Sequence, residues 1–163
     1  MVSVVRTFLL LGSNLGDRQD FLEKGRSLIK KRIGKIVAIS SIYQTAAWGN
    51  TKQSAFLNQV IGVETKLSPE VLLKAIQDIE KLHGRMQTEK WAPRTLDIDI
   101  LFYGDQIINN PDLIVPHPEV ANRKFTLEPL MEVEPDLIHP VLNKTVRKLL
   151  AACKDELPVE IYR

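Results

Sequence analysis

The chain has 163 residues, of which 44% are hydrophobic and 26% charged, and its formal net charge at pH 7 is +2. This composition is typical of a globular domain and excludes a disordered chain, while so small a charge argues against a general affinity for nucleic acid. The single cysteine excludes an internal disulfide, so we expect a cytoplasmic protein. No repeat or linker divides the sequence, and we expect one domain over residues 1–163.

The first part of the chain alternates between strand and helix patterns. Residues 4–11 are mostly apolar or β-branched, which predicts a buried strand, and the apolar run at residues 8–11 is too short to span a bilayer. Apolar residues at helical spacing then predict a helix over residues 17–32. Two further strands, 36–43 and 56–65, flank a long loop.

The second part opens with a strong helix signal. Ser68 is followed by a proline and an acid, which predicts a helix that continues to Leu82. Residues 95–103 alternate as a strand, and residues 106–108 are expected to return as its antiparallel partner. Frequent prolines then predict loops with short helices, before a last helix over residues 143–153. This order of elements predicts an α+β sandwich, with helices packed on a mainly antiparallel sheet.

Two aspartates in the strand expected at 95–103 carry the clearest chemical signal. A strand turns every second side chain to the same face, so Asp97 and Asp99 share one face while Leu96 and Ile98 turn to the other. The strand rise places the two α-carbons about 7 Å apart, within reach of one metal ion or of two bridged ions. Hard carboxylate oxygens with few neighbouring His or Cys residues favour magnesium over zinc.

An ordinary solvent-facing strand is the alternative interpretation of this pattern, because alternating polar residues are common on such a face. Aspartate is, however, a poor strand former, and two on one face disfavour the strand without a compensating role. The neighbouring residues therefore decide between the two interpretations.

A polar segment, residues 84–94, leads directly into the aspartate strand and carries Arg85, Lys90 and Arg94. Cations beside carboxylates indicate a polyphosphate, because the planar fork of arginine binds phosphate oxygens while a metal ion neutralises the remaining charge. The alternative is that the two arginines form structural ion pairs with the aspartates or with Glu80.

His117 lies between two prolines in a later loop. It is a candidate donor to a phosphate. A histidine in this setting is, however, more often a structural hydrogen-bonding group, so its sequence context alone favours the structural role.

The aromatic residues indicate how a second ligand is bound. Phe56 and Asn58 stand two residues apart in a strand and so share a face, and Phe125 is a second candidate aromatic. Aromatic faces with one amide suit a flat, nitrogen-rich ring, although both phenylalanines are equally compatible with a place in the core. Trp48 and Trp91 lie in expected loops and are candidates for a lid.

Together these motifs resemble the 6-hydroxymethyl-7,8-dihydropterin pyrophosphokinases of the folate pathway. The resemblance covers nearly the whole chain, and its most distinctive stretch is Pro-Arg-Thr-Leu-Asp-Ile-Asp at residues 93–99. The segments that carry it are residues 12–16, 56–58, 84–85, 91–100 and 115–117.

The resemblance implies a ferredoxin-like α+β fold, two magnesium ions, and transfer of the β,γ-diphosphate of ATP to the pterin hydroxymethyl group. The implied partners are therefore small molecules, with neither nucleic acid nor membrane. By similarity, Asp97 and Asp99 bind both ions and act in catalysis with Arg85 and Arg94. The nucleotide side would comprise Arg85, Lys90, Trp91, Arg94, Ile100, His117 and Arg123. The pterin side would comprise Thr45, Trp48, Phe56, Asn58, Asp97 and Phe125, with the two phenylalanines sandwiching the ring.

Three positions depart from the family's pattern. Gln87 stands where an arginine of the catalytic loop is frequent, Pro118 where an aromatic is common, and Ile114 where a small polar residue is usual near the nucleotide. These departures bear on ATP contact and loop closure rather than on the reaction itself.

Two other functions fit parts of the pattern. A two-metal nucleotidyl transferase or nuclease would also use a strand pair of aspartates beside basic loops, but the weak net charge speaks against it. A non-enzymatic RNA-binding module of ferredoxin-like shape is the second, but a sheet face bearing Asp97 and Asp99 would repel RNA phosphates in the absence of metal.

Overall fold

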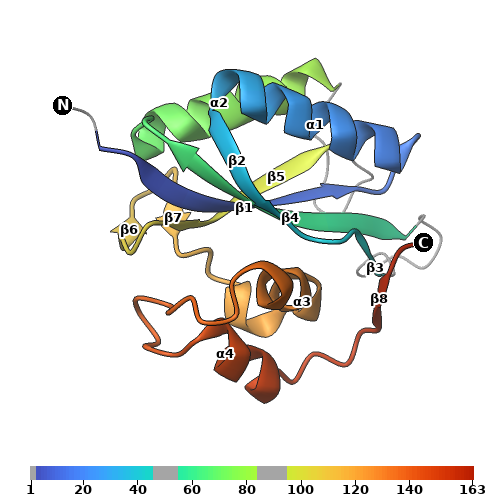
Figure 1. Cartoon of the computed structure of the whole chain (residues 1–163), viewed down its shortest axis with the longest axis vertical. Coiled ribbons are helices and arrows are strands. Elements are labelled where there is room, and N and C mark those ends of the chain that lie inside the picture. Colours follow the sequence, from blue (N-terminus) through green and yellow to red (C-terminus); the bar gives the residue numbers. More distant parts are fainter. Residues whose placement is uncertain (1–2, 46–54, 84–94) are drawn as a thin grey trace.

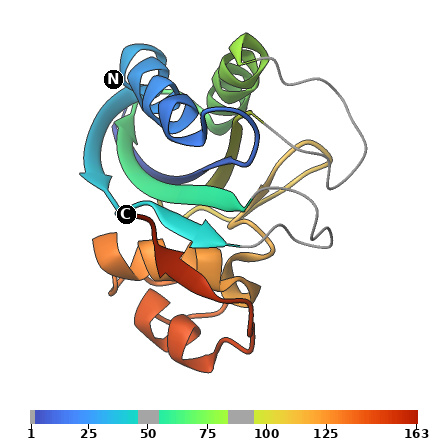
Figure 2. The same cartoon turned by 90° about the vertical axis from the view of Figure 1, so that its right-hand side faces the viewer.

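The computed structural model describes residues 3–45, 55–83 and 95–163. Two helices cover one face of the central sheet, and two shorter helices lie on the other face (Figures 1 and 2). The first pair is α1 (Arg18–Arg32) and α2 (Pro69–Leu82), and the second pair is α3 (Lys124–Val133) and α4 (Val146–Ala152). In this part of the chain, none of the helices has the length and apolar character that a membrane span requires.

The central sheet has six strands among the described residues, and all its pairs are antiparallel. Its order is β5-β1-β4-β3-β8, and β2 also pairs with β4. Counting β2 and β3 as one interrupted strand, the chain runs strand-helix-strand-strand-helix-strand from β1 to β5, which is a ferredoxin-like fold and confirms the expected class. The strands are β1 (Val5–Ser13), β2 (Gly34–Ile39), β3 (Tyr43–Thr45), β4 (Phe56–Thr65), β5 (Asp97–Tyr103) and β8 (Val159–Ile161).

Each face of the sheet carries its own hydrophobic core. Leu11 and Ile98 turn to the side of α1 and α2, where they pack with Leu22 and Ile76 of those helices. Alternation along β1 turns Leu10 to the opposite side, into a second cluster beneath α3 and α4. A strand residue therefore faces one core or the other, and this fixes which side chains are turned toward α3.

Local capping explains where the two long helices begin. The Asp17 carboxylate accepts a hydrogen bond from the Asp20 amide at 3.1 Å, and Ser68 caps α2 in the same way, with proline in its first turn. These are the boundaries expected from the sequence, and β4 likewise spans the predicted residues 56–65.

The strand predicted at 36–43 is interrupted. β2 ends at Ile39 and β3 begins at Tyr43. Between them, the Ser40 amide donates to the Val60 carbonyl, while the Ser40 hydroxyl accepts from the Val60 amide, both at 3.0 Å. A side chain therefore replaces a backbone group in the ladder, and the strand breaks there.

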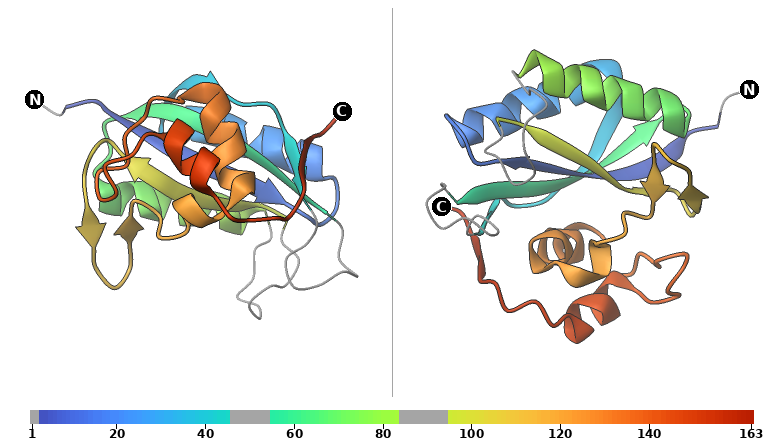
Figure 3. Two further views of the ribbon diagram at one scale, coloured as in Figure 1. Left: turned by 90° about the horizontal axis from the view of Figure 1, so that it is seen from below. Right: turned by 180° about the vertical axis from the view of Figure 1, so that it is seen from behind.

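The predicted pairing of residues 106–108 with the aspartate strand is wrong. The Gln106 amide donates to the Tyr103 carbonyl at 3.1 Å, which turns the chain away from β5. The next strands, β6 (Ile108–Asn109) and β7 (Ile114–Val115), pair with each other in a separate two-stranded sheet (Figure 3). The Asn110 carboxamide accepts from two amides of the intervening turn, which stabilises this small ladder.

Candidate active site

The two aspartates lie as the strand pattern predicts. Asp97 and Asp99 are half-buried on one face of β5, while Leu96, Ile98 and Ile100 are at most 6% exposed on the other. Leu101 belongs to the cluster beneath α3, and alternation places both carboxylates on that same face. Hydrophobic burial on the side of α1 and α2 thus orients the aspartates toward α3.

Strand register places three residues in a row across this face. Gly12 on β1 is the direct partner of Asp97 on β5 and of Asn58 on β4. Directly opposed residues share a face, and two strand spacings put the α-carbons of Asn58 and Asp97 about 10 Å apart. The structure therefore brings together a carboxylate and a carboxamide that are distant in sequence, with a glycine between them.

The residues expected on the pterin side lie next to this row, on β3 and β4. Thr45 is the direct partner of Phe56, and Tyr43 is that of Asn58. Asn58 is buried, at 5% exposed, and Phe56 is half-buried. Among the residues that the structure describes, none is a hydrogen-bond partner of the buried Thr45 hydroxyl, which leaves a polar group beside the aromatic ring.

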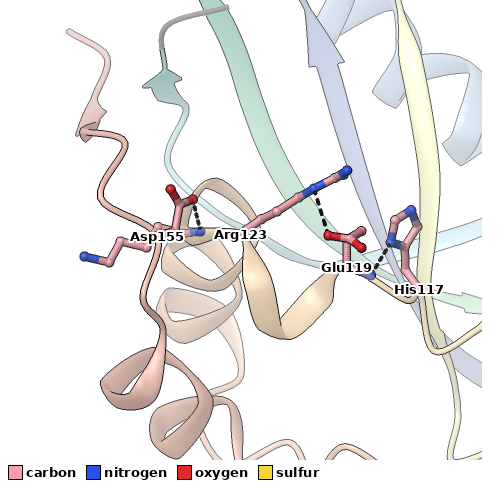
Figure 4. Close-up of polar contacts among 5 residues, drawn as sticks. His117, Glu119, Arg123 and Asp155 are labelled. Atoms are coloured by element: carbon pink, nitrogen blue, oxygen red, sulfur yellow. Dashed lines mark hydrogen bonds and ion pairs between the residues drawn. The ribbon is translucent and has the colours of Figure 1, made fainter. Parts of the chain in front are cut away.

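Phe125 and Arg123 stand at the start of α3. The Arg123 guanidinium lies 5.5 Å from the centre of the Phe125 ring, and its Nε is 3.9 Å from the Glu119 carboxylate (Figure 4). The Lys124 amide donates to the Asp155 carboxylate at 3.1 Å, which secures the first turn of the helix. The arginine extends from this turn toward the sheet (Figure 4), and the Phe125 ring lies against its guanidinium.

His117 has the structural hydrogen bonds that its proline context indicates. Its amide donates to the Leu101 carbonyl at 2.9 Å, and its Nδ1 accepts from the Glu119 amide at 3.1 Å (Figure 4). Burial, and then the nearby Arg123 guanidinium, lower the pKa of His117, although Glu119 and Asp97 oppose this shift. The ring is therefore neutral at pH 7, and with Nδ1 accepting, Nε2 carries the proton that an anion can accept.

A cavity of about 280 Å³ lies along the outer edge of β5. It is lined by Asp99 and Ile100 of the strand, by His117, and by apolar residues such as Leu113 and Ile114 from the β6–β7 segment. Ile114 is 48% exposed, so it presents an apolar surface to the cavity. A cleft that combines apolar side chains with polar groups suits the base of a nucleotide.

Glu80 organises this edge. Its carboxylate, on α2 and 5% exposed, accepts a hydrogen bond from the Ile98 amide at 2.9 Å. Because backbone groups of alternate strand residues point to the same edge, those of Ile100 also point away from β1 and toward the cavity. The backbone there offers one donor and one acceptor to a ligand.

The carboxylate pair fits magnesium better than other metals. Among residues 3–45, 55–83 and 95–163, no group of three or more His, Cys, Asp or Glu side chains is placed to hold an ion. Two carboxylates without a third protein ligand suit magnesium, which is typically bound by one or two carboxylates together with substrate phosphates. Asp97 and Asp99 are thus a fitting donor set only when phosphate oxygens complete it.

Five predicted site residues lie outside the described residues, and their roles stay predictions. They are Trp48, Arg85, Lys90, Trp91 and Arg94.

The sequence placed Gly12 in a family motif without a role of its own, and it offered Glu80 only as an alternative ion-pair partner for the arginines. Glu80 carried a readable signal, because it stands four residues after buried Ile76 on the apolar face of α2. The signal for Gly12 is weaker, since only strand register shows what lies beside it.

Comparison with known proteins gives consistent results. The family model described as 7,8-dihydro-6-hydroxymethylpterin-pyrophosphokinase matches residues 8–135. A 2-amino-4-hydroxy-6-hydroxymethyldihydropteridine pyrophosphokinase of Aquifex aeolicus is 42% identical over 86% of this chain and 88% of its own length. The protein of the same name from Methylorubrum extorquens is 38% identical over 91% of this chain and 93% of its own.

Longer proteins also contain a matching region. The Pneumocystis carinii folic acid synthesis protein fol1 is 40% identical over 85% of this chain, which spans 19% of that protein. The crystal structure of wild-type Plasmodium falciparum HPPK-DHPS has a TM-score of 0.73 at 20% identity, over 91% of this chain and 44% of that one. At this identity the structural similarity shows the fold alone.

Proposed function

The chain belongs to the 7,8-dihydro-6-hydroxymethylpterin-pyrophosphokinase family, and from this premise we propose how its residues carry out the reaction. The enzyme transfers the diphosphate group of ATP to 6-hydroxymethyl-7,8-dihydropterin in folate synthesis. This membership favours the transferase over the nuclease and the RNA-binding module that the sequence left open. One observation carries the assignment of roles. Asp97 belongs to the row across the sheet with Gly12 and Asn58, and Asp99, two residues later on the same strand, lines the cavity at the sheet edge.

The pterin occupies the row on the face toward α3. Asn58 reads the edge of the ring, since a carboxamide both donates and accepts hydrogen bonds. Phe56 on β4 and Phe125 on α3 sandwich the ring, and the buried Thr45 hydroxyl lies beside Phe56. This arrangement directs the hydroxymethyl group toward Asp97.

The nucleotide occupies the cavity along the edge of β5. Its base lies against Ile114, accepts a hydrogen bond from the Ile100 amide and donates one to the Ile100 carbonyl, while its phosphates extend past His117 toward Asp99. The neutral His117 donates its Nε2 proton to a phosphate oxygen. Arg123 contributes positive charge from the start of α3.

Asp97 and Asp99 would hold two magnesium ions together with the phosphate oxygens of ATP. When bound, magnesium supplies neutralisation of phosphate charge and lowers the pKa of the pterin hydroxyl. Two carboxylates this close together repel each other, so bound cations would also stabilise their half-buried arrangement on this face.

The chemistry is an in-line displacement. The hydroxymethyl oxygen attacks the β-phosphorus of ATP, the bond from this phosphorus to the oxygen bridging the α-phosphate breaks, and AMP leaves. The hydroxyl proton passes to one of the two aspartates or to water. His117 and Arg123 stabilise the charge on the transferred group through donors that are already positioned.

The remaining assignments complete the proposal. Arg85, Lys90, Trp91 and Arg94 bind the nucleotide or its phosphates, and the loop around Trp48 closes over the pterin, as the resemblance to the family implies. The protein works as a single catalytic domain in the cytoplasm, on small molecules and without nucleic acid or membrane.

The test is formation of AMP that depends on the pterin alcohol. Purified protein with ATP, magnesium and 6-hydroxymethyl-7,8-dihydropterin should yield AMP and pterin diphosphate in equal amounts, and EDTA should stop the reaction. Asp97→Asn and Asp99→Asn should each lower the rate at least about a hundredfold. Asp105→Asn, in the exposed turn after β5, is the matched control and should retain the wild-type rate. Release of ADP, or AMP formation without pterin, would refute the proposal.

A further inference from the structure

We propose that Gly12 is a positioning residue for the acceptor, because its missing side chain leaves the space in which the Asn58 amide lies. This inference rests on the proposed function, since it concerns the residue that reads the pterin edge. It adds a determinant of acceptor fit on β1 (Val5–Ser13), a strand to which the proposed function assigns no pterin contact.

The space beside Gly12 is filled by one group. A β-carbon added at this position would lie 2.8 Å from Asn58 Oδ1, a separation that carbon and oxygen atoms do not tolerate. The next neighbours, the Leu57 carbonyl oxygen and Asn58 Cγ, lie at 3.8 and 3.9 Å, which are ordinary contact distances. The clash of a larger residue would therefore fall on the carboxamide oxygen and leave the backbone in place.

Backbone conformation does not explain the glycine. The described glycines with positive φ are Gly16 and Gly104, at 72° and 54°, whereas Gly12 lies within a regular ladder on both of its sides. Glycine weakens the interior of a strand and often marks a close approach of other groups. The absent side chain, and not a special φ value, is thus what this position requires.

Asn58 has little room to retreat from an added methyl group. Its direct partner on the other side is Tyr43, which is 8% exposed and donates its hydroxyl proton to the Glu132 carboxylate at 2.7 Å. Asn58 is itself only 5% exposed and lies between Tyr43 and Gly12 in the strand register, so burial limits where its carboxamide can move. An alanine at position 12 should turn or displace the amide, which would misalign its donor and acceptor with the ring edge.

The expected effect is confined to one substrate. Asn58 lies on the face toward α3, whereas the nucleotide cavity lies along the outer edge of β5. Gly12→Ala should therefore raise the KM for the pterin alcohol at least tenfold and leave the KM for ATP within about twofold. A tenfold change corresponds to about 1.4 kcal/mol, comparable with one lost hydrogen bond.

The experiment is a double-mutant cycle on the intact enzyme. AMP formation is measured for wild type, Gly12→Ala, Asn58→Ala and the double variant, with the KM determined for each substrate. If the glycine acts through the amide, Gly12→Ala should change the pterin KM less than twofold once Asn58 is alanine. Gly62→Ala replaces a glycine elsewhere in the sheet, where the added β-carbon would meet Phe8 and Ala38 at 3.2 and 3.3 Å, and should leave both KM values unchanged.

The outcomes separate the inference from the proposed function. An unchanged pterin KM in Gly12→Ala, or an equal change in both backgrounds, would overturn the inference while the enzyme assignment stands. A wild-type protein that forms no AMP from the pterin alcohol would overturn the function itself. If Gly12→Ala unfolds readily, the double variant should recover stability because the clashing amide is gone, and no recovery would also overturn the inference.

Discussion

Glu80 connects α2 to the strand that carries both aspartates, and its removal should destabilise the fold measurably. Its buried carboxylate accepts a hydrogen bond from the Ile98 amide at 2.9 Å. A hydrogen bond of this kind contributes about 0.5 to 1.5 kcal/mol, and leaving the buried amide unsatisfied adds a penalty of about 1 to 3 kcal/mol. Glu80→Ala should therefore lower the free energy of unfolding by about 3 kcal/mol. For a domain of this size that corresponds to a fall in Tm of about 6 to 12 °C.

Urea denaturation followed by circular dichroism tests this value, with Glu80→Gln as the informative comparison. Glutamine keeps an acceptor oxygen at nearly the same place, so Glu80→Gln should lower the free energy of unfolding by only about 1 kcal/mol. Gln77→Ala removes an exposed side chain from the same helix and should change stability by less than about 0.5 kcal/mol. Equal losses for alanine and glutamine, or a loss below 1 kcal/mol for alanine, would refute the assigned role of this hydrogen bond.

Three further predictions follow from single contacts. Because the pKa of His117 is lowered in the fold, the unfolded chain binds the proton first, so wild type should lose stability relative to His117→Gln as the pH falls through about 6.5. Urea titrations from pH 8 to 5 would show this loss, and a pH-independent difference would contradict it. Tyr43→Phe should cost about 1 kcal/mol in urea denaturation by removing the hydroxyl that donates to Glu132, and wild-type stability would argue against a net contribution. Gly34→Ala would place a β-carbon in steric overlap with the Glu64 carbonyl oxygen, so the free energy of unfolding should fall by more than about 3 kcal/mol, and an unchanged Tm would be incompatible with this strand pairing.

Local patterns were sufficient for much of the fold. The caps at Asp17 and Ser68 are formed by residues next to the helices they begin, so the sequence contains the whole interaction. Alternation between Asp97, Ile98 and Asp99 likewise depends only on neighbouring residues, which is why the shared face was predicted correctly.

Long-range pairings were beyond such patterns. β8 pairs with β3 across more than a hundred residues, and its short, partly polar sequence gave no strand signal. The break at Ser40 depends on Val60 of another strand, and the pairing of β6 with β7 depends on a turn that directs the chain away from β5. The fit of Asn58 beside Gly12 has the same origin, since only the register of β4 against β1 brings the two residues together.

The contacts along β5 also protect the protein against self-association. β5 is the outermost strand on its side of the sheet, and an uncovered outermost strand can recruit strands from other molecules into aggregates. Here the Ile98 amide already donates to the Glu80 carboxylate, and the Leu101 carbonyl already accepts from the His117 amide. A strand from another molecule therefore cannot hydrogen-bond to either of these two backbone groups. The outer edge of β5 can still bind a small ligand between them, but it is a poor template for a further strand.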